Sequence, residues 1–185
     1  MSDFPVLETK RLVLREFRDS DAQAVFDIFA QDDVTTSLNS ETMQSMEEAE
    51  RKVASRIGLF RNEQGIRWGI TLKARGDVVV GSCGFYLLNW YFYSCEIGYE
   101  LHPRYWRRGI MTEALTAAIN LSYSDRFFFR LNRIQALTYV HSEPSIGLLK
   151  KLGFKEEGIQ REYAYWKGQF HDLCCFSLLR RDWAT

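Results

Sequence analysis

The 185-residue chain is neutral overall, with 24 lysine and arginine residues against 24 aspartate and glutamate residues. This balance excludes a strong global attraction to nucleic acid or an anionic membrane. The 46% apolar content predicts a single globular domain over residues 1–185. No run reaches the roughly 18 apolar residues of a membrane span, and the N-terminus lacks the basic-then-apolar order of a secretory signal. We therefore expect a cytoplasmic protein with four reduced cysteines.

The first half of the chain mixes strand and helix signals. Residues 11–17 alternate apolar and polar side chains, which predicts a strand, and residues 19–21 are typical helix caps. Ser45 and Glu48 fit a capping box at the start of a longer amphipathic helix. Three further strands, separated by turn signals, are expected at residues 67–73, 78–87 and 91–101.

The second half predicts helices and strands in alternation. A helix is expected over residues 109–123 and a strand over 133–139. Ser142 is a good N-cap for a short helix that Gly153 would end in a left-handed conformation. Two closing strands are expected at residues 155–165 and 171–179. The resulting order, β-α-α-β-β-β-α-β-α-β-β, indicates a mixed α/β fold.

Two aromatic runs, at residues 85–93 and 127–129, invite structural interpretations. The first is expected to be a β-hairpin with one face on the core, and a subunit interface or a wall of a substrate cleft are the alternatives. The second is expected to pack beneath the sheet. Three scattered histidines show no metal-ligand spacing, so no metal site is expected.

The most informative stretch is residues 96–114, where a strand-like run, a basic turn and a helix follow one another. A helix that opens at Gly109 presents unpaired backbone N–H groups and the positive end of its dipole, which together favour an anion. Arg104, Arg107 and Arg108 add positive charge around the turn. The stretch contains neither a P-loop nor a Gly-x-Gly-x-x-Gly pattern, so we expect a diphosphate-binding turn of another kind.

Residues 106–111 resemble motif A of the GNAT superfamily of acyl-CoA N-acyltransferases, Arg/Gln-x-x-Gly-x-Gly/Ala, and residues 112–114 resemble its RimJ/RimL branch. Trp106, Arg107 and Met111 depart from the usual pattern, and Gly109 fits it. Residues 142–154 resemble the family's Asn-x-x-Ser…Glu-Lys-Leu-Gly-Phe signature, and residues 7–15 are similar to the branch's first strand. The resemblance thus spans nearly the whole chain.

This resemblance implies a central, mostly antiparallel sheet that is flanked by helices and splayed between its fourth and fifth strands, where acetyl-CoA enters. The strand ending at Leu101 would pair with the pantetheine arm, and Ser142 stands where an asparagine usually contacts it. The backbone amides implied to hold the diphosphate are those of Arg107, Arg108, Gly109, Ile110, Met111 and Thr112.

Two catalytic residues are proposed on the same basis. Ser145 occupies the position of a serine that would protonate the departing thiolate, and a helix-capping or core hydroxyl is the alternative. Some relatives carry a glutamate at the position of Ala164 as the base. In its absence Glu100 is the preferred base, with Glu96, residues 162–163 or a chain of waters as competitors. A buried carboxylate with a raised pKa would be the expected signature of the base.

The function implied is acetyl-CoA-dependent N-acetylation of a primary amine. The branch favours the α-amino group of a protein N-terminus, such as that of a ribosomal protein, over a polyamine, amino acid or antibiotic. A non-catalytic CoA-binding module is the alternative of another class, and a homodimer is an open possibility. RNA binding through Arg104, Arg107 and Arg108 is disfavoured, because a neutral chain supplies few phosphate contacts.

Overall fold

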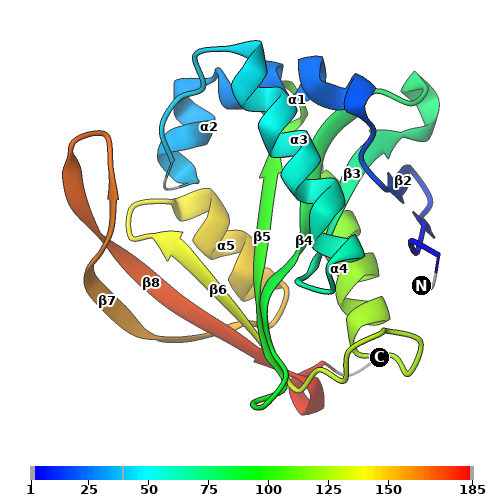
Figure 1. The fold of residues 1–185 in the computed structure, drawn as a ribbon. Helices are drawn as coiled ribbons and strands as arrows, with labels where there is room; N and C mark the ends of the chain where they lie inside the picture. Colours follow the sequence, from blue (N-terminus) through cyan, green and yellow to red (C-terminus); the bar gives the residue numbers. More distant parts are fainter. Residues whose placement is uncertain (1–2, 39, 184–185) are drawn as a thin grey trace.

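The computed structural model describes residues 3–38 and 40–183. Within them, strand pairing forms an eight-stranded sheet in the order β1-β2-β3-β4-β5-β6-β8-β7 (Figure 1). All its pairs are antiparallel except β5 with β6. The strands are β1 (Leu7–Glu8), β2 (Leu12–Arg15), β3 (Ile66–Leu72), β4 (Val79–Asn89), β5 (Ser94–Leu101), β6 (Arg133–Tyr139), β7 (Lys155–Trp166) and β8 (Gln169–Leu179).

The expected order of elements is confirmed, with two additions, β1 and α2. The helices are α1 (Ala22–Phe29), α2 (Asp32–Ser37), α3 (Met46–Arg61), α4 (Ile110–Ser122) and α5 (Glu143–Lys151). The predicted cap at Ser45 is present, since its hydroxyl accepts a hydrogen bond from the Glu48 N–H at 3.4 Å. None of the helices in the described residues is long and apolar enough to cross a membrane.

The sheet divides where β5 meets β6. These strands pair in parallel at only three positions, and the last joins Glu96 to Gln135. Beyond that pair the strands diverge, and Figure 1 shows them opening upward as the two arms of a V. Counted from the strand expected at residues 11–17, β5 and β6 are the fourth and fifth strands. The predicted splay is therefore confirmed.

Helices cover both faces of the sheet. Figure 1 shows α3 in front of the sheet and α4 behind it. A large apolar cluster lies under α4, and a smaller one joins α1 to α3. Phe127 and Phe129 are buried in the large cluster, as expected for the second aromatic run. All four cysteines are buried and free.

The first aromatic run follows its prediction only in part. Phe85 is fully buried on the core, but the four aromatic residues of the β4–β5 turn are exposed. They lie outside the paired strands, so the alternation that buries Phe85 does not extend to them. The run therefore divides into a core residue and a surface turn.

Candidate active site

The turn between β5 and α4 has an unusual backbone conformation. Arg107 and Gly109 both adopt left-handed conformations, with φ of 58° and 69°. The indole N–H of Trp106 donates to the Leu101 carbonyl at 2.7 Å and holds the turn against the end of β5. Left-handed residues beside right-handed ones turn successive N–H groups toward one concave side, which is a typical anion-binding geometry.

Six consecutive backbone N–H groups, from Arg107 to Thr112, have no acceptor among the described residues. The first hydrogen bond of α4 runs from the Glu113 N–H to the Gly109 carbonyl, at 3.1 Å. A Cβ on Gly109 would approach no atom closer than Arg11 Nη2, at 3.6 Å. The turn therefore requires glycine for its positive φ rather than for lack of space.

Contacts from the N-terminal strands hold the other side of the turn. Glu113 accepts hydrogen bonds from the Thr9 hydroxyl at 2.6 Å and from Arg11 Nε at 2.6 Å. Arg11 Nη1 also donates to the Arg108 carbonyl at 2.9 Å. Burial alone would raise the pKa of Glu113, but the Thr9 and Arg11 contacts outweigh it and lower that pKa. The acid in the first turn of α4 is thus neutralised locally. Thr9 and Arg11 were missed, because nothing in their spacing links them to the turn.

The edge of β5 that faces β6 is open above Glu96. The His102 N–H bonds to the Val80 carbonyl at 2.9 Å, so alternate residues of β5 direct their backbone groups toward β4. Ile97 and Tyr99 therefore direct theirs toward the diverging strand. The Leu101 carbonyl, which was expected to serve the pantetheine arm, already accepts the Trp106 indole.

Ser145 contacts a tyrosine across the gap where β5 and β6 diverge. Its Oγ lies 2.7 Å from the Tyr99 hydroxyl, so this contact joins β5 to α5. Burial raises the pKa of Tyr99 to about 12, although the Ser145 contact opposes the shift. The phenol is therefore protonated at neutral pH. Tyr99 was not predicted, and the signal that could have found it is its central place in the strand before the basic turn.

Ser142 begins α5 but does not cap it through its side chain. Its carbonyl accepts the Ile146 N–H at 3.0 Å, and the hydroxyl makes no capping bond. Ser142 therefore occupies the predicted N-cap position without a hydroxyl cap, and the pantetheine contact stays a prediction. The end of α5 is as expected: Gly153 has a φ of 85°, and the Phe154 N–H bonds to the Leu149 carbonyl at 3.0 Å.

Glu100 lies in a buried charge network. Its carboxylate accepts from Arg56 Nη2 at 2.7 Å, and it also accepts from Arg67 Nη2 and from the Ser82 hydroxyl. Burial would raise the pKa of Glu100, but the two guanidinium groups and Ser82 together lower it below its ordinary value. The raised pKa expected of the base is therefore wrong for Glu100, because its charge is already satisfied.

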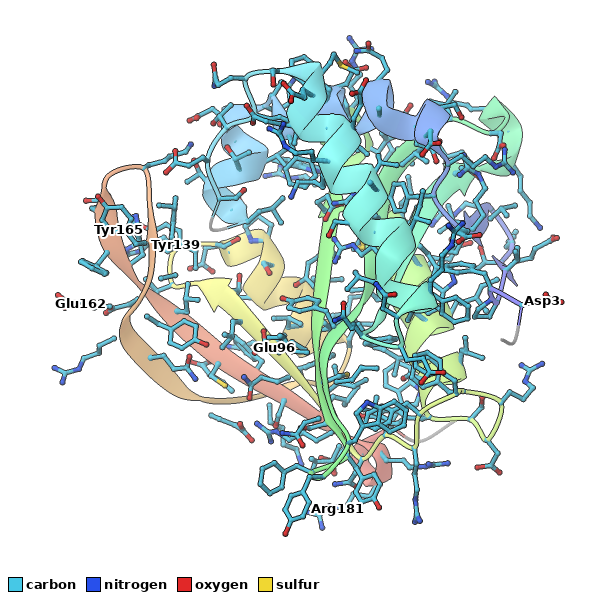
Figure 2. All side chains as sticks on the ribbon, viewed as in Figure 1. Asp3, Glu96, Tyr139, Glu162, Tyr165 and Arg181 are labelled. Atoms are coloured by element: carbon cyan, nitrogen blue, oxygen red, sulfur yellow. The ribbon has the colours of Figure 1, made fainter. Side chains whose placement is uncertain are left out.

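Glu96 lies on the same face of β5 in a different environment. Burial raises the pKa of Glu96, opposed by hydrogen bonding from Tyr86 and Gln135. The Gln135 amide lies 3.4 Å from its carboxylate. No guanidinium pairs with Glu96 among the described residues. Glu96 occupies the last β5–β6 pair, and Figure 2 shows it between the two strands.

The β7–β8 turn is tied to the N-terminal part of the chain by Lys167. Its ammonium donates to the Thr36 hydroxyl at 2.8 Å and to the Asp32 carboxylate, and its backbone N–H donates to Glu41. Lys167 lowers the pKa of Asp32. Beside the turn, the Trp166 and His171 rings stack with centroids 3.4 Å apart. The turn is therefore held close to α2.

The side chains that could accept or donate a proton lie on opposite faces of β5. Glu96 shares a face with Glu100, which contacts α3 through Arg56, whereas Tyr99 contacts α5 on the other face. Glu162, a sequence competitor for the base, is exposed on β7, away from β5. No group of histidine, cysteine, aspartate or glutamate side chains in residues 3–38 and 40–183 could hold a metal ion.

Comparison with known proteins agrees with this geometry. The Acetyltransferase (GNAT) domain family matches residues 11–155. The N-acetyltransferase YoaA of Bacillus subtilis is 36% identical over 177 residues, covering 96% of this chain and 98% of the relative. The [ribosomal protein uS5]-alanine N-acetyltransferase of Escherichia coli is 28% identical over 188 residues, covering 96% and 92%.

A solved structure shares the fold. RimL, the ribosomal L7/L12 α-N-protein acetyltransferase in complex with coenzyme A, superposes with a TM-score of 0.81 at 19% identity, covering 95% of this chain and 98% of that one. The family match spans most of the chain, and the V between β5 and β6 lies beside the basic turn. The chain therefore belongs to the GNAT family of N-acetyltransferases.

Proposed function

We propose that this enzyme transfers the acetyl group of acetyl-CoA to the α-amino group of a protein N-terminus. The observation that carries the proposal is the arrangement along β5. Glu96, with a raised pKa, lies at the vertex of the V, the Tyr99–Ser145 pair lies beside the open edge, and the free N–H groups follow the strand's end. These are the parts that acyl transfer from a thioester requires.

The basic turn fits the diphosphate of the co-substrate. The N–H groups from Arg107 to Thr112 would donate to its oxygens, with Arg107 and Arg108 as exposed positive groups beside them. The open edge at Ile97 and Tyr99 would pair with the amides of the pantetheine arm. That edge leads from the turn to the vertex, so the thioester would reach Glu96 and Tyr99.

Glu96, rather than Glu100, would act as the base. It would take a proton from the acceptor ammonium, directly or through one water, on the α3 face of β5. The amine nitrogen then bonds to the acyl carbon and loses its second proton to water as the carbon–sulfur bond breaks. Ser145 would give its proton to the departing sulfur and regain one from Tyr99, on the opposite face of the strand, and water would return a proton to Tyr99. The first deprotonation and the protonation of sulfur thus use side chains already in place, and no enzyme nucleophile is needed.

A peptide acceptor is favoured for two reasons. An extended peptide can pair with free strand edges, which the V and β7 provide. The E. coli relative is named as an alanine N-acetyltransferase of ribosomal protein uS5. A small amine remains the second candidate, since the YoaA relative carries only the general name N-acetyltransferase.

The test of the reaction is turnover of acetyl-CoA with alanine- or serine-initiated peptides, compared with spermidine and an aminoglycoside. We expect the peptides to lead in kcat/KM by about tenfold or more, a difference of about 1.4 kcal/mol. A tenfold lead for either small amine would overturn the N-terminal assignment and leave the acetyltransferase chemistry intact. Failure of every amine would indicate a CoA-binding module instead.

The diphosphate placement has its own test. Gly109→Ala strains a left-handed residue inside the turn, whereas Gly76→Ala strains a residue with φ of 74° and ψ of −153° in the turn before β4. Gly109→Ala should cost about 1–2 kcal/mol of stability. Gly76→Ala should cost more, because its backbone region is readily adopted only by glycine. Only Gly109→Ala should weaken acetyl-CoA binding in calorimetry, because the turn must relax away from the anion. Equal acetyl-CoA affinity in the two variants would contradict the placement.

A further inference from the structure

The turn between β4 and β5 exposes a group of large apolar side chains, far along β5 from the basic turn. Tyr91 is 84% exposed and Phe92 is 67% exposed, the highest values in this group. The group, which we call the aromatic tip, consists of Leu87, Trp90, Tyr91, Phe92 and Tyr93. A contiguous exposed set of this kind typically marks an interaction site.

The aromatic tip is a rigid structure. The Asn89 side chain accepts hydrogen bonds from the Tyr91 and Phe92 N–H groups, at 3.1 and 2.9 Å. The Trp90 ring packs against Phe129, with centroids 4.5 Å apart. Tyr93 holds a φ of 52°, a conformation that costs a non-glycine residue about 1–3 kcal/mol. The fold therefore bears strain while it presents these rings to solvent.

A hollow of about 580 Å³ lies beside the aromatic tip. Its wall combines apolar side chains, two cations, one carboxylate and two neutral polar groups: Phe92, Tyr93, Phe127, Leu131, Arg130, Arg180, Asp125, Ser124 and Asn132. The Arg130 guanidinium lies 6.0 Å from the centre of the Tyr93 ring. The hollow thus offers aromatic and aliphatic side chains beside an excess of positive charge, a combination that can receive an apolar side chain from an acidic segment.

The cations around the tip are arginines. Arg126 and Arg130 are exposed, and no carboxylate among the described residues forms an ion pair with either. Arg180 pairs with the fully exposed Asp125 at 3.3 Å. Figure 2 shows Arg181 at the lower end of the molecule. No lysine lines the hollow. Aromatic residues and arginine are enriched in protein interfaces, whereas lysine is depleted.

From these observations we propose that the aromatic tip and its hollow form a docking site for an acidic protein segment that inserts an apolar side chain. A symmetric contact with a second copy is less suitable, because it would bring arginines against arginines. Single-stranded RNA is also less suitable, because the two lining arginines, Arg130 and Arg180, supply few contacts for phosphates. The site lies at the opposite end of β5 from the basic turn.

The test uses a fluorescent dodecapeptide of eight glutamates interspersed with leucine and phenylalanine. The comparison probes are the same peptide with lysine in place of each glutamate and a 12-nucleotide oligouridine. Fluorescence anisotropy should show binding of the acidic peptide to the whole protein. Tyr91→Ser/Phe92→Ser and, separately, Arg130→Glu should each weaken it about tenfold, the loss expected of interface anchors. Both variants should keep wild-type acetyl-CoA turnover.

Matched controls come from the same chain. Tyr165 and Phe170 form another exposed Tyr–Phe pair, with centroids 5.0 Å apart against 4.9 Å for Tyr91 and Phe92. Tyr165→Ser/Phe170→Ser and Arg51→Glu, on the exposed face of α3, should leave peptide binding unchanged.

Three outcomes would overturn the proposal. Oligouridine binding that both tip variants abolish would indicate a nucleic-acid site. Self-association in sedimentation that Tyr91→Ser/Phe92→Ser removes would indicate a contact between copies. Acidic-peptide binding that is absent, or equal in the tip variants and the controls, would show that the tip receives no acidic segment.

Discussion

Glu96 and Glu100 are two carboxylates on the same face of the same strand, yet their environments shift their pKa values in opposite directions. Glu100 lies beneath α3 and pairs with Arg56 and Arg67. Glu96 lies at the vertex of the V, where burial acts on it without a paired guanidinium. Position on the strand thus decides which face a side chain occupies, and its neighbours decide its chemistry.

This contrast separates a structural carboxylate from a chemical one. A lowered pKa indicates a charge that the fold stabilises, whereas a raised pKa indicates a charge that the fold tolerates poorly. A base that takes a proton from an ammonium near neutral pH benefits from the second environment. We therefore expect Glu100 to stabilise β5 and Glu96 to be available for proton transfer.

The largest expected effect is on the stability of Glu100→Gln. Removing one partner leaves Arg56 and Arg67 buried without their counter-charge, which should lower the free energy of unfolding by about 3–5 kcal/mol. Urea denaturation measures it. Glu157→Gln is the matched control, because Glu157 also pairs with an arginine, Arg133, and a serine, but is partly exposed. It should lose only about 0.2–1 kcal/mol.

The opposite outcome for Glu100 would reverse the comparison. If Glu100→Gln kept wild-type stability but lost turnover, and its pH profile lost one ionisation, the base would be Glu100. The pH dependence of stability gives a second criterion. The lowered pKa means that Glu100 contributes stability above its unfolded value of 4.5, and that this stability is lost as pH falls through the folded pKa. Glu100→Gln should lack this acid-dependent loss.

Glu96→Gln should affect turnover rather than folding. Loss of a general base should lower kcat by about 10²–10⁴-fold with little change in acetyl-CoA affinity, measured by steady-state kinetics and calorimetry. The rise of wild-type kcat with pH, through the raised pKa of Glu96, should disappear. Glu96→Asp, which keeps a carboxylate, should retain part of that rise. Unchanged kcat in Glu96→Gln would leave a chain of waters as the base.

The change in stability at neutral pH should distinguish Glu96→Gln from Glu100→Gln. Because the folded pKa of Glu96 is raised, its contribution to stability is present below its unfolded pKa and is lost as pH rises through the folded pKa. Above its folded pKa, the charged Glu96 therefore weakens the fold. Glu96→Gln should be at least as stable as the wild type at pH 7, whereas Glu100→Gln should be much less stable.

A third variant pair tests the proton donor on the other face of β5. Ser145→Ala should lower kcat by about 10²-fold, the lower end of the range for general acid–base catalysis, with little change in acetyl-CoA affinity. Tyr99→Phe removes the phenol proton that Ser145 would draw on, so it should produce a similar kcat. The double variant should be no slower than either single variant, because the two groups act in one relay. Additive losses would indicate independent roles.

Local signals predicted much of the fold. The strand at residues 133–139 has the expected limits, because its alternation is regular, and Gly153 ends α5 as its position after an apolar helix suggested. The helix α2 was missed because its six residues are mostly polar, with only Val34 and Thr35 buried. Gly109 was found from its place at the start of a helix and from the motif that it fits, and its φ of 69° gives the physical reason for a glycine there.

Contacts between distant residues were beyond prediction. Arg56 and Arg67 lie 44 and 33 residues from Glu100 along the chain, and their spacing has no periodicity that links them to it. Ser145 was identified from a motif, but its partner Tyr99 lies 46 residues away. The sequence thus indicated which elements carry the chemistry, and only their packing distinguished the paired glutamate from the unpaired one.

The smallest expected effect concerns Lys167, whose ion pair is exposed where that of Glu100 is buried. Lys167→Ala removes the ammonium contacts to Asp32 and Thr36 but keeps the backbone bond to Glu41. A peptide acceptor would pair with the β7 edge, so loss of this contact should affect acceptor binding. Because exposed ion pairs contribute little, the acceptor KM should rise only about two- to fivefold, with unchanged acetyl-CoA affinity and melting temperature. Steady-state kinetics with a serine-initiated peptide measures the change.

Two further variants decide how to interpret that result. Lys167→Arg keeps a cation at the β7–β8 turn and should restore most of the acceptor affinity. Lys155→Ala removes another exposed pair, with Asp182 at 3.2 Å, at the opposite end of β7, and should change nothing. If Lys167→Ala instead weakened acetyl-CoA binding as much as acceptor binding, the contact would hold the two arms of the V together for both substrates. The acceptor side would then have no separate determinant at this turn.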